Sequence, residues 1–169
     1  MKIRTFLIFV SILSIIIVFA GCNSSQKITT ANPLKITQND KKIILNYLDT
    51  KTNDIAYPSK GKMYSAFELL GTDKDKIYIW VVKEEYIKAG TNLESGQGVS
   101  LPVVLKIKKS SKGISIISHD FPKDGVNYNK DVKKLFPANI RFPNNEEIKN
   151  LVKVTETRAE EDLKNSPIK

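Results

Sequence analysis

The sequence predicts an α+β domain in which one helix precedes a four-stranded antiparallel meander and two helices follow it. Three observations lead to this prediction: an apolar helical stripe before residue 50, strand-like segments joined by turn residues between 63 and 119, and helical spacing after residue 128. This element order also fits a curved sheet wrapped on the first helix, as in cystatin-like or NTF2-like folds. This analogy rests on element order alone and says little about function.

The first helix is expected to begin near residue 39 and to end near residue 50. Asn39 or Asp40 can cap it, and a loop containing Pro58 follows it. The apolar residues of this segment fall on one stripe: Ile43, Ile44, Tyr47 and Leu48.

The first two strands are expected to form a hairpin. By residue type, Met63 to Gly71 could be a short helix, but the turn-forming residues at 72–75 favour a strand that turns into the next one. The second strand contains Ile77 to Val82, in which the residues that point to either face of the strand are apolar or aromatic. Both of its faces must therefore be covered, which predicts a central strand.

The third and fourth strands complete the meander. Residues 89–98 are rich in Gly and Ser and are predicted to be a loop, and residues 99–108 then alternate as a strand. Pro102 lacks an N–H, so it favours the beginning of that strand or an edge. A turn at 109–113 leads into the fourth strand, residues 114–119.

Two helices are expected at the end of the domain. Helical spacing from Tyr128 to Phe136 indicates a short one, stopped by Pro137. A longer helix is expected from about Pro143, with an apolar stripe that thins after Val154, so its last turns should project into solvent.

The composition narrows the class of protein. A chain of 169 residues with 41% hydrophobic residues is long enough for one domain and too apolar for full disorder. A single Cys excludes an internal disulfide and the Cys-rich kind of metal site. No phosphate-binding Gly loop, zinc spacing or nucleophile elbow is found, so we expect no metal and no cofactor.

The N-terminus has the order of an export signal. Lys2 and Arg4 precede the apolar run Phe6 to Ala20, which is shorter than the roughly 20 residues of a transmembrane helix. The run ends in Ala20-Gly21 directly before Cys22, the only cysteine of the chain.

This arrangement resembles the lipobox of bacterial lipoproteins, with Phe19 where that family most often has Leu. The resemblance implies cleavage before Cys22, a diacylglycerol on its sulfur, and attachment to the outer face of the cell membrane. Residues 1–21 would then be the signal peptide, 22–38 a flexible tether and 39–165 the folded domain. A plain signal peptide cut near Ala20 and an uncleaved signal anchor are the alternatives.

Several stretches of the body also resemble uncharacterised lipoproteins and exported domains of low-GC Gram-positive bacteria. That resemblance supports the location and implies no activity. It rests on residues 78–81, 85–86, 121–128 and 133–137.

The residues with catalytic potential do not form a recognisable set. Ser118-His119-Asp120 cannot be a relay on a strand, because neighbouring strand residues point to opposite faces. Glu84 and Glu85 face opposite ways for the same reason, and one of them could lie at the rim of an apolar surface, where desolvation raises its pKa. A strand-end histidine and a solvent-facing carboxylate pair are the simpler interpretations.

Two interaction surfaces are nevertheless predicted. Trp80 and Tyr86, together with Glu84, could line a ligand pocket on a curved sheet, although core packing is the simpler interpretation. A lysine cluster could contact anionic lipid or wall polymer, or could serve solubility alone: Lys106, Lys108, Lys109 and Lys112.

Together, these features predict a lipid-anchored envelope protein that binds a protein, peptide or wall component without catalysis. The alternative is a small-ligand-binding or hydrolytic domain with a pocket near Trp80 and Glu84. Nucleic acid is not an expected partner. Removal of Lys2 and Arg4 with the signal peptide lowers the formal charge from +9 to +7.

Overall fold

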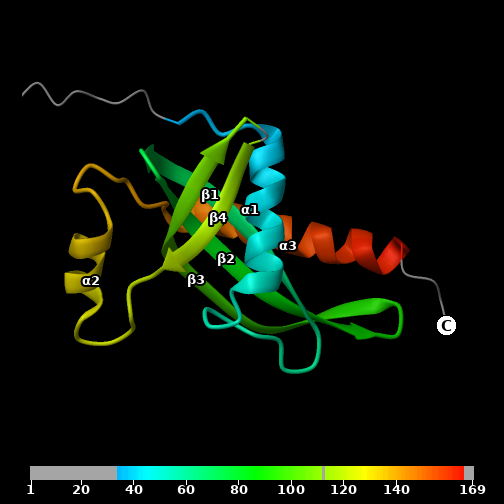
Figure 1. Cartoon of the computed structure of the whole chain (residues 1–169). Coiled ribbons are helices and arrows are strands. Elements are labelled where there is room, and N and C mark those ends of the chain that lie inside the picture. Colours follow the sequence, from blue (N-terminus) through cyan, green and yellow to red (C-terminus); the bar gives the residue numbers. More distant parts are fainter. Residues whose placement is uncertain (1–33, 112, 166–169) are drawn as a thin grey trace, which may run out of the picture.

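The computed structural model describes residues 34–111 and 113–165, and within them the predicted α+β class and element order are confirmed (Figure 1). The elements are α1 (Gln38–Lys51), β1 (Lys62–Asp73), β2 (Lys76–Ala89), β3 (Asn92–Ser110), β4 (Gly113–Asp120), α2 (Tyr128–Leu135) and α3 (Asn145–Asn165).

The four strands form one antiparallel sheet in the order β1-β2-β3-β4. Helix α1 lies on one face and contacts the two outer strands, β1 and β4, whereas α3 packs on β1 and β2 from the other side (Figure 1). Helix α2 lies on the side away from the free end of α3, and its Val132 and Leu135 pack against a cluster that contains Tyr78 of β2. The sheet is thus covered on both faces, as the uniformly apolar second strand predicts.

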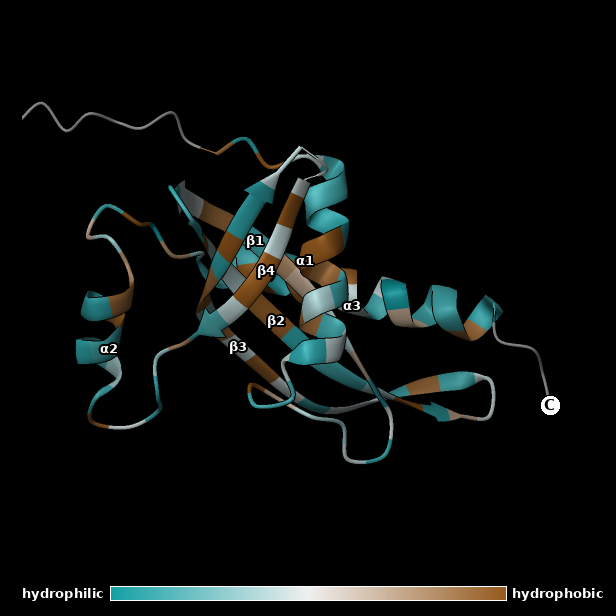
Figure 2. Cartoon of the chain, viewed as in Figure 1, coloured by the Kyte–Doolittle hydropathy of each residue, from teal (hydrophilic) through white to brown (hydrophobic). Residues whose placement is uncertain are grey.

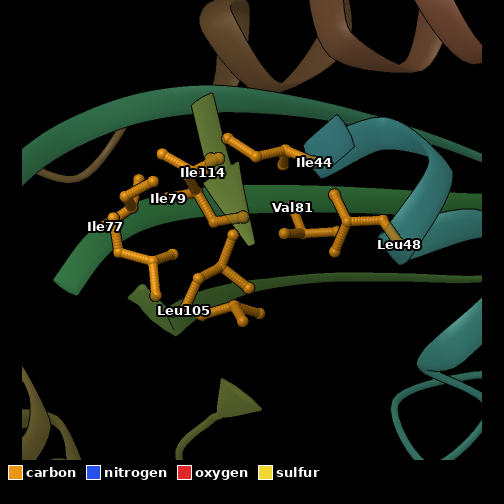
Figure 3. Packing of buried hydrophobic residues seen from close by; sticks show 9 residues of the cluster. Ile44, Leu48, Ile77, Ile79, Val81, Leu105 and Ile114 are labelled. Atoms are coloured by element: carbon orange, nitrogen blue, oxygen red, sulfur yellow. The ribbon is translucent and has the colours of Figure 1, made fainter. Parts of the chain in front are cut away.

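The main core lies between α1 and the sheet. Ile44 and Leu48 of α1 are fully buried and reach toward Ile79 and Val81 of β2 (Figure 3). Each such side chain contributes about 1.5–3 kcal/mol when it is removed from water. Hydrophobic residues gather in the central strands and in the part of α1 against them, while the outer turns of α3 are mainly hydrophilic (Figure 2).

Helix α1 begins earlier than predicted. Thr37 is its N-cap, and its hydroxyl accepts from the N–H of Asp40 at 3.2 Å while the Asp40 carboxylate accepts from the N–H of Thr37 at 2.9 Å. Asp40 also accepts from the N–H of Ile114 at 3.2 Å, so it joins α1 to β4. Leu34 and Ile36, which the sequence assigns to the tether, pack against the core.

The hairpin between the first two strands is confirmed, since Met63 to Gly71 lies within β1 and pairs with β2. The predicted loop at 89–98 is wrong, because β2 runs to Ala89 and β3 starts at Asn92 across a two-residue turn. Within this segment Ser95 pairs with Tyr86 and Gly98 pairs with Glu84 of β2, and Gly96 lies at the bulge between them. Gly90 at the turn has a φ of 65°, which glycine adopts without strain.

Pro102 lies in the middle of β3, not at its beginning. It is opposite Trp80 on β2, but β4 pairs with β3 only from Val104 onward. At Pro102 the strand therefore has a neighbour on one side only, and a missing N–H on the open side costs no ladder bond.

Helix α3 packs along β1 and β2. Asn144 caps it, since its side-chain oxygen accepts from the N–H groups of Glu146 at 2.9 Å and Glu147 at 3.0 Å. Beyond Val154, Thr155 and Ala159 continue the buried stripe. These two residues are small, so α3 can lie close to the strands where its stripe of large apolar residues thins.

Candidate functional site

A wide groove lies between the β2–β3 hairpin and the C-terminal half of α3. It has a volume of about 870 Å³ and adjoins a smaller hollow of about 290 Å³ that shares four lining residues with it. We call the two together the hairpin groove. The shared residues are Tyr86, Lys88, Leu93 and Leu163.

The floor of the hairpin groove is aromatic. Tyr64 of β1 and Tyr86 of β2 lie edge to face, with ring centroids 6.0 Å apart, and they pack with Ala159 and Leu93. Both rings occupy the face of the sheet that α3 covers, because they are near neighbours across the β1–β2 ladder. The floor thus combines apolar area with two phenol groups.

Hydrogen bonds fix both phenols to α3. The Tyr64 hydroxyl donates to Asp162 at 2.7 Å, and the Tyr86 hydroxyl lies 3.1 Å from the hydroxyl of Thr155. Burial, and then the bond to Asp162, raise the pKa of Tyr64. Lys62 lies 2.8 Å from Asp162 and, as the largest cause, lowers the pKa of that carboxyl. These groups are held in place and stay uncharged or paired at neutral pH.

The rim of the hairpin groove carries both signs of charge. Its acidic residues are Glu94, Glu156, Glu160 and Asp162, and its basic residues are Lys60, Lys62, Lys88 and Lys164. His119, the only histidine of the sequence, is not among the residues that line this groove. An aromatic floor with a mixed-charge rim can contact both the apolar and the charged groups of a ligand.

A buried carboxylate holds one wall of the hairpin groove. Glu85 is fully buried and accepts from the N–H groups of Ser59 at 2.8 Å, Lys60 at 2.6 Å and Gly61 at 2.6 Å. The Ser59 hydroxyl also donates to it at 2.9 Å. These donors, first of all the N–H of Gly61, lower the pKa of Glu85 to about 2.

Glu85 lies at a β-bulge in the β2–β3 ladder, between Glu84 and Tyr86. Gly96 lies directly over its carboxylate, where a Cβ atom would collide with it. The bulge and this glycine let one carboxylate join β2, β3 and the loop after α1.

The three residues predicted to line a pocket separate in the structure. Tyr86 lines the hairpin groove, but Trp80 and Glu84 do not. The Trp80 ring packs against Phe142 and its indole N–H donates to the Ser100 hydroxyl at 2.8 Å. Glu84 is half-buried against Gly98, and burial raises its pKa, as desolvation at a rim predicts.

His119 acquires partners that its sequence neighbours do not supply. Its Nδ1 lies 2.9 Å from the Tyr47 hydroxyl and its Nε2 lies 3.0 Å from Asp54, while its ring stacks on Phe121. Ser118 and Asp120 flank it on β4, where neighbouring side chains point to opposite faces of the sheet. None of these residues lines the hairpin groove, and the cluster joins α1, β4 and the loop after α1.

A second polar cluster is fully buried and was missed in the sequence. Lys83 donates to the carbonyl of Thr52 at 2.9 Å and to its hydroxyl at 2.7 Å, and burial lowers the pKa of this lysine. Beside it, Asp49 accepts from Arg158 at 2.7 Å. The sequence did indicate this burial. Lys83 follows Ile77, Ile79 and Val81 at every second position, so it points to the same covered face of β2.

The predicted lysine cluster lies at the end of the sheet farthest from the hairpin groove. Lys106 and Lys108 are exposed on β3, with Lys109 beside them, and Lys76 lies directly opposite Lys106 on β2. The chain enters the body at this same end, because the hydroxyl of Thr72 donates to the carbonyl of Leu34 at 3.4 Å. Cys22 and Lys112 lie outside the described residues.

The described residues thus form an α+β domain with an open groove beside its β2–β3 hairpin. Comparison with protein families, with curated proteins and with solved structures finds no match to this chain. Across residues 34–111 and 113–165, no three His, Cys, Asp or Glu side chains gather closely enough to hold a metal ion. In the same residues no helix combines the length and apolarity that a membrane crossing requires.

Proposed function

We propose that this protein is a lipid-anchored binding module of the cell envelope, which presents the hairpin groove to an amphoteric ligand away from the membrane. One observation carries this proposal: the lysine cluster and the entry of the chain lie at one end of the sheet, and the hairpin groove lies at the other. The 14 residues of β2 separate the two ends by roughly 45 Å along the strand.

The lipobox at Cys22 supplies the anchor in this proposal, and two acyl chains suffice for stable attachment. The segment between Cys22 and Leu34 reaches at most roughly 40 Å when fully extended, so the lysine end of the sheet stays near the membrane. Each lysine near an anionic surface adds about 1 kcal/mol to the attraction. Lys76, Lys106 and Lys108 would then face lipid headgroups or an anionic wall polymer.

Replacement of Cys22 tests the anchor. The Cys22→Ala chain, or the native chain in cells treated with globomycin, is expected to accumulate as a precursor or as a released form. Membrane fractionation with gel mobility measures this, and Ser24→Ala is the matched control. If the Cys22→Ala chain has the native size and stays fully in the membrane fraction, the anchor proposal is wrong.

Charge reversal on the rim tests the hairpin groove. Soluble fragments released from the cell wall by a muramidase are a suitable probe, because their peptides carry both amine and carboxylate groups. The pair Glu94→Lys and Glu156→Lys is expected to weaken binding of these fragments to the full chain roughly tenfold or more, since two of the four acidic residues of the rim would become basic. Isothermal titration in detergent measures the affinity.

Two controls accompany this experiment. Glu161→Lys makes the same change on α3 outside the groove and should leave the affinity unchanged. Lys106→Glu with Lys108→Glu should also leave it unchanged, while weakening adsorption to vesicles that contain anionic lipid. Fragment binding that is absent from the native chain, or equal in the native and Glu94→Lys/Glu156→Lys chains, would contradict this use of the groove.

A hydrolytic domain remains the second candidate, but no specific contact favours it. The only histidine lies outside the groove, and Glu84, whose raised pKa suits acid–base work, lies outside the lining too. The binding role is therefore the one that the geometry supports best.

A further inference from the structure

Strand β1 is an edge of the sheet, and at Ser65 two side chains from the helices bond its outward backbone groups. The N–H of Ser65 donates to Asp49 of α1 at 3.0 Å, and the carbonyl of Ser65 accepts from Arg158 of α3 at 2.5 Å. The backbone groups of Ser65 therefore point away from β2, toward the open side of the sheet. Asp49 and Arg158 close that side here, and they pair with each other at 2.7 Å.

Two and four residues further along β1, the outward backbone groups have no such partner within the described part of the chain. In an antiparallel ladder, residues two apart direct their N–H and C=O groups to the same side, so Phe67 and Leu69 also direct theirs outward. No group in residues 34–111 or 113–165 bonds to these outward N–H and C=O groups. The bulge between Leu69 and Gly71 ends this stretch of regular edge.

A hollow of about 290 Å³ runs beside this edge, between α1 and the first turns of α3. Leu69 is 39% exposed and Val154 is 47% exposed, which is high for large apolar side chains that line one hollow. We call the hollow and the open backbone together the edge groove. Its apolar lining comes from Leu45, Ala66, Phe67, Leu69, Leu151 and Val154.

The polar lining of the edge groove is basic. Lys41 and Lys42 of α1 stand on its wall with Gln38, and no acidic residue lines it. An occupant must therefore present backbone groups to β1, apolar side chains to the hollow and negative charge to α1. If a second copy of this chain paired with this edge, Lys41 and Lys42 of both copies would lie close together. The repulsion between these like charges opposes such a dimer.

We propose that the edge groove binds an extended segment of a partner protein, which adds to the sheet as a strand beside Phe67 and Leu69. The segment has alternating apolar residues and at least one Asp or Glu that pairs with Lys41 or Lys42. Main-chain hydrogen bonds supply affinity in this mode of recognition, and the pockets for alternate side chains supply specificity. The edge groove shares no lining residue with the hairpin groove, so this site is independent of the proposed function.

A displayed library of random octapeptides, selected on the full chain in detergent, tests the proposal. The enriched peptides are expected to alternate apolar residues and to carry an acidic residue at a fixed place. Leu69→Pro removes one outward N–H without touching the β2 ladder, and it is expected to weaken an enriched synthetic peptide on the order of tenfold. Leu69→Val retains the N–H and the apolar character, and it should change the affinity far less.

The charge of α1 gives a second readout that does not require the Leu69→Pro substitution in β1. Selection on the Lys41→Glu/Lys42→Glu chain is expected to enrich basic peptides in place of acidic ones. In the native chain, hydrogen exchange of the Leu69 amide should slow only when peptide is present.

Four results would overturn the proposal. They are selection that enriches no peptide, equal affinity in the Leu69→Pro and Leu69→Val chains, a dimer by sedimentation that Leu69→Pro abolishes, and protection of the Leu69 amide without peptide. The third would assign the edge to a second copy, and the fourth to another segment of the chain itself.

Discussion

Replacing Glu85 by glutamine is expected to lower the melting temperature at pH 7 by on the order of 5 °C. The substitution exchanges a carboxylate that accepts from Ser59, Lys60 and Gly61 for an amide with one oxygen. The amide NH₂ group would then face N–H donors, which leaves some of those buried groups without an acceptor. The wall of the hairpin groove that contains Lys60 and Gly61 should loosen with it.

The effect should depend on pH in a defined direction. Because the pKa of Glu85 falls from 4.5 to about 2 on folding, the carboxylate contributes stability above pH 4.5 and loses it as the pH falls toward 2. The melting temperatures of the native and Glu85→Gln chains should therefore converge near pH 2. Calorimetry or circular dichroism across this range measures the difference.

Glu84→Gln is the matched control, since the two residues are adjacent and have opposite environments. Burial raises the pKa of Glu84, so its ionisation opposes folding as the pH rises above 4.5. Glu84→Gln should leave stability at pH 7 unchanged or slightly higher. A constant gap between the native and Glu85→Gln melting temperatures from pH 7 to pH 2 would contradict the assigned role of Glu85.

Replacing Lys83 by alanine is expected to cost about 2–4 kcal/mol of unfolding free energy. The side chain is fully buried between α1 and the sheet, so its removal leaves a cavity and breaks both bonds to Thr52. Lys83→Met fills the same space without a charge and should cost less than about 1.5 kcal/mol. Urea denaturation of the two variants measures these values.

The small cost of Lys83→Met follows from the partners that remain. The Thr52 carbonyl still accepts from the N–H of Ile55 at 3.1 Å, and the Thr52 hydroxyl still donates to Leu48 at 2.6 Å. Because burial lowers the pKa of Lys83, native stability should rise as the pH approaches 10.5 from below, and Lys83→Met should lose that rise. Equal destabilisation by methionine and alanine would show that the ammonium group itself is required.

The fold class could be predicted because it depends on side-chain periodicity, which is local. The run Ile77 to Val82 is apolar at both phases, and this alone placed β2 inside the sheet with cover on both faces. The strand-like reading of residues 63–71 was likewise favoured by the turn that follows them. The segment 89–98 could not be predicted, because Gly and Ser there gain their strand geometry from pairing across a bulge.

The candidate site could be predicted only in part. Tyr86 was identified as an aromatic residue on the sheet, but Trp80, on the same strand and face, packs against Phe142 instead. Periodicity tells which face of β2 a side chain occupies. It does not tell which end of the strand α3 covers and where a hollow is left.

The sequence by itself determined the α+β class, the order of its elements, the central place of β2 and the opposite facing of Glu84 and Glu85, because backbone alternation and helical spacing impose them. The tertiary structure alone decided the partners of the polar groups. His119 meets Tyr47 and Asp54, Glu85 meets residues 59–61, and the two grooves form where α3 and α1 leave strands uncovered. These contacts join residues far apart in the chain, so packing of the whole domain fixes them and no local pattern encodes them.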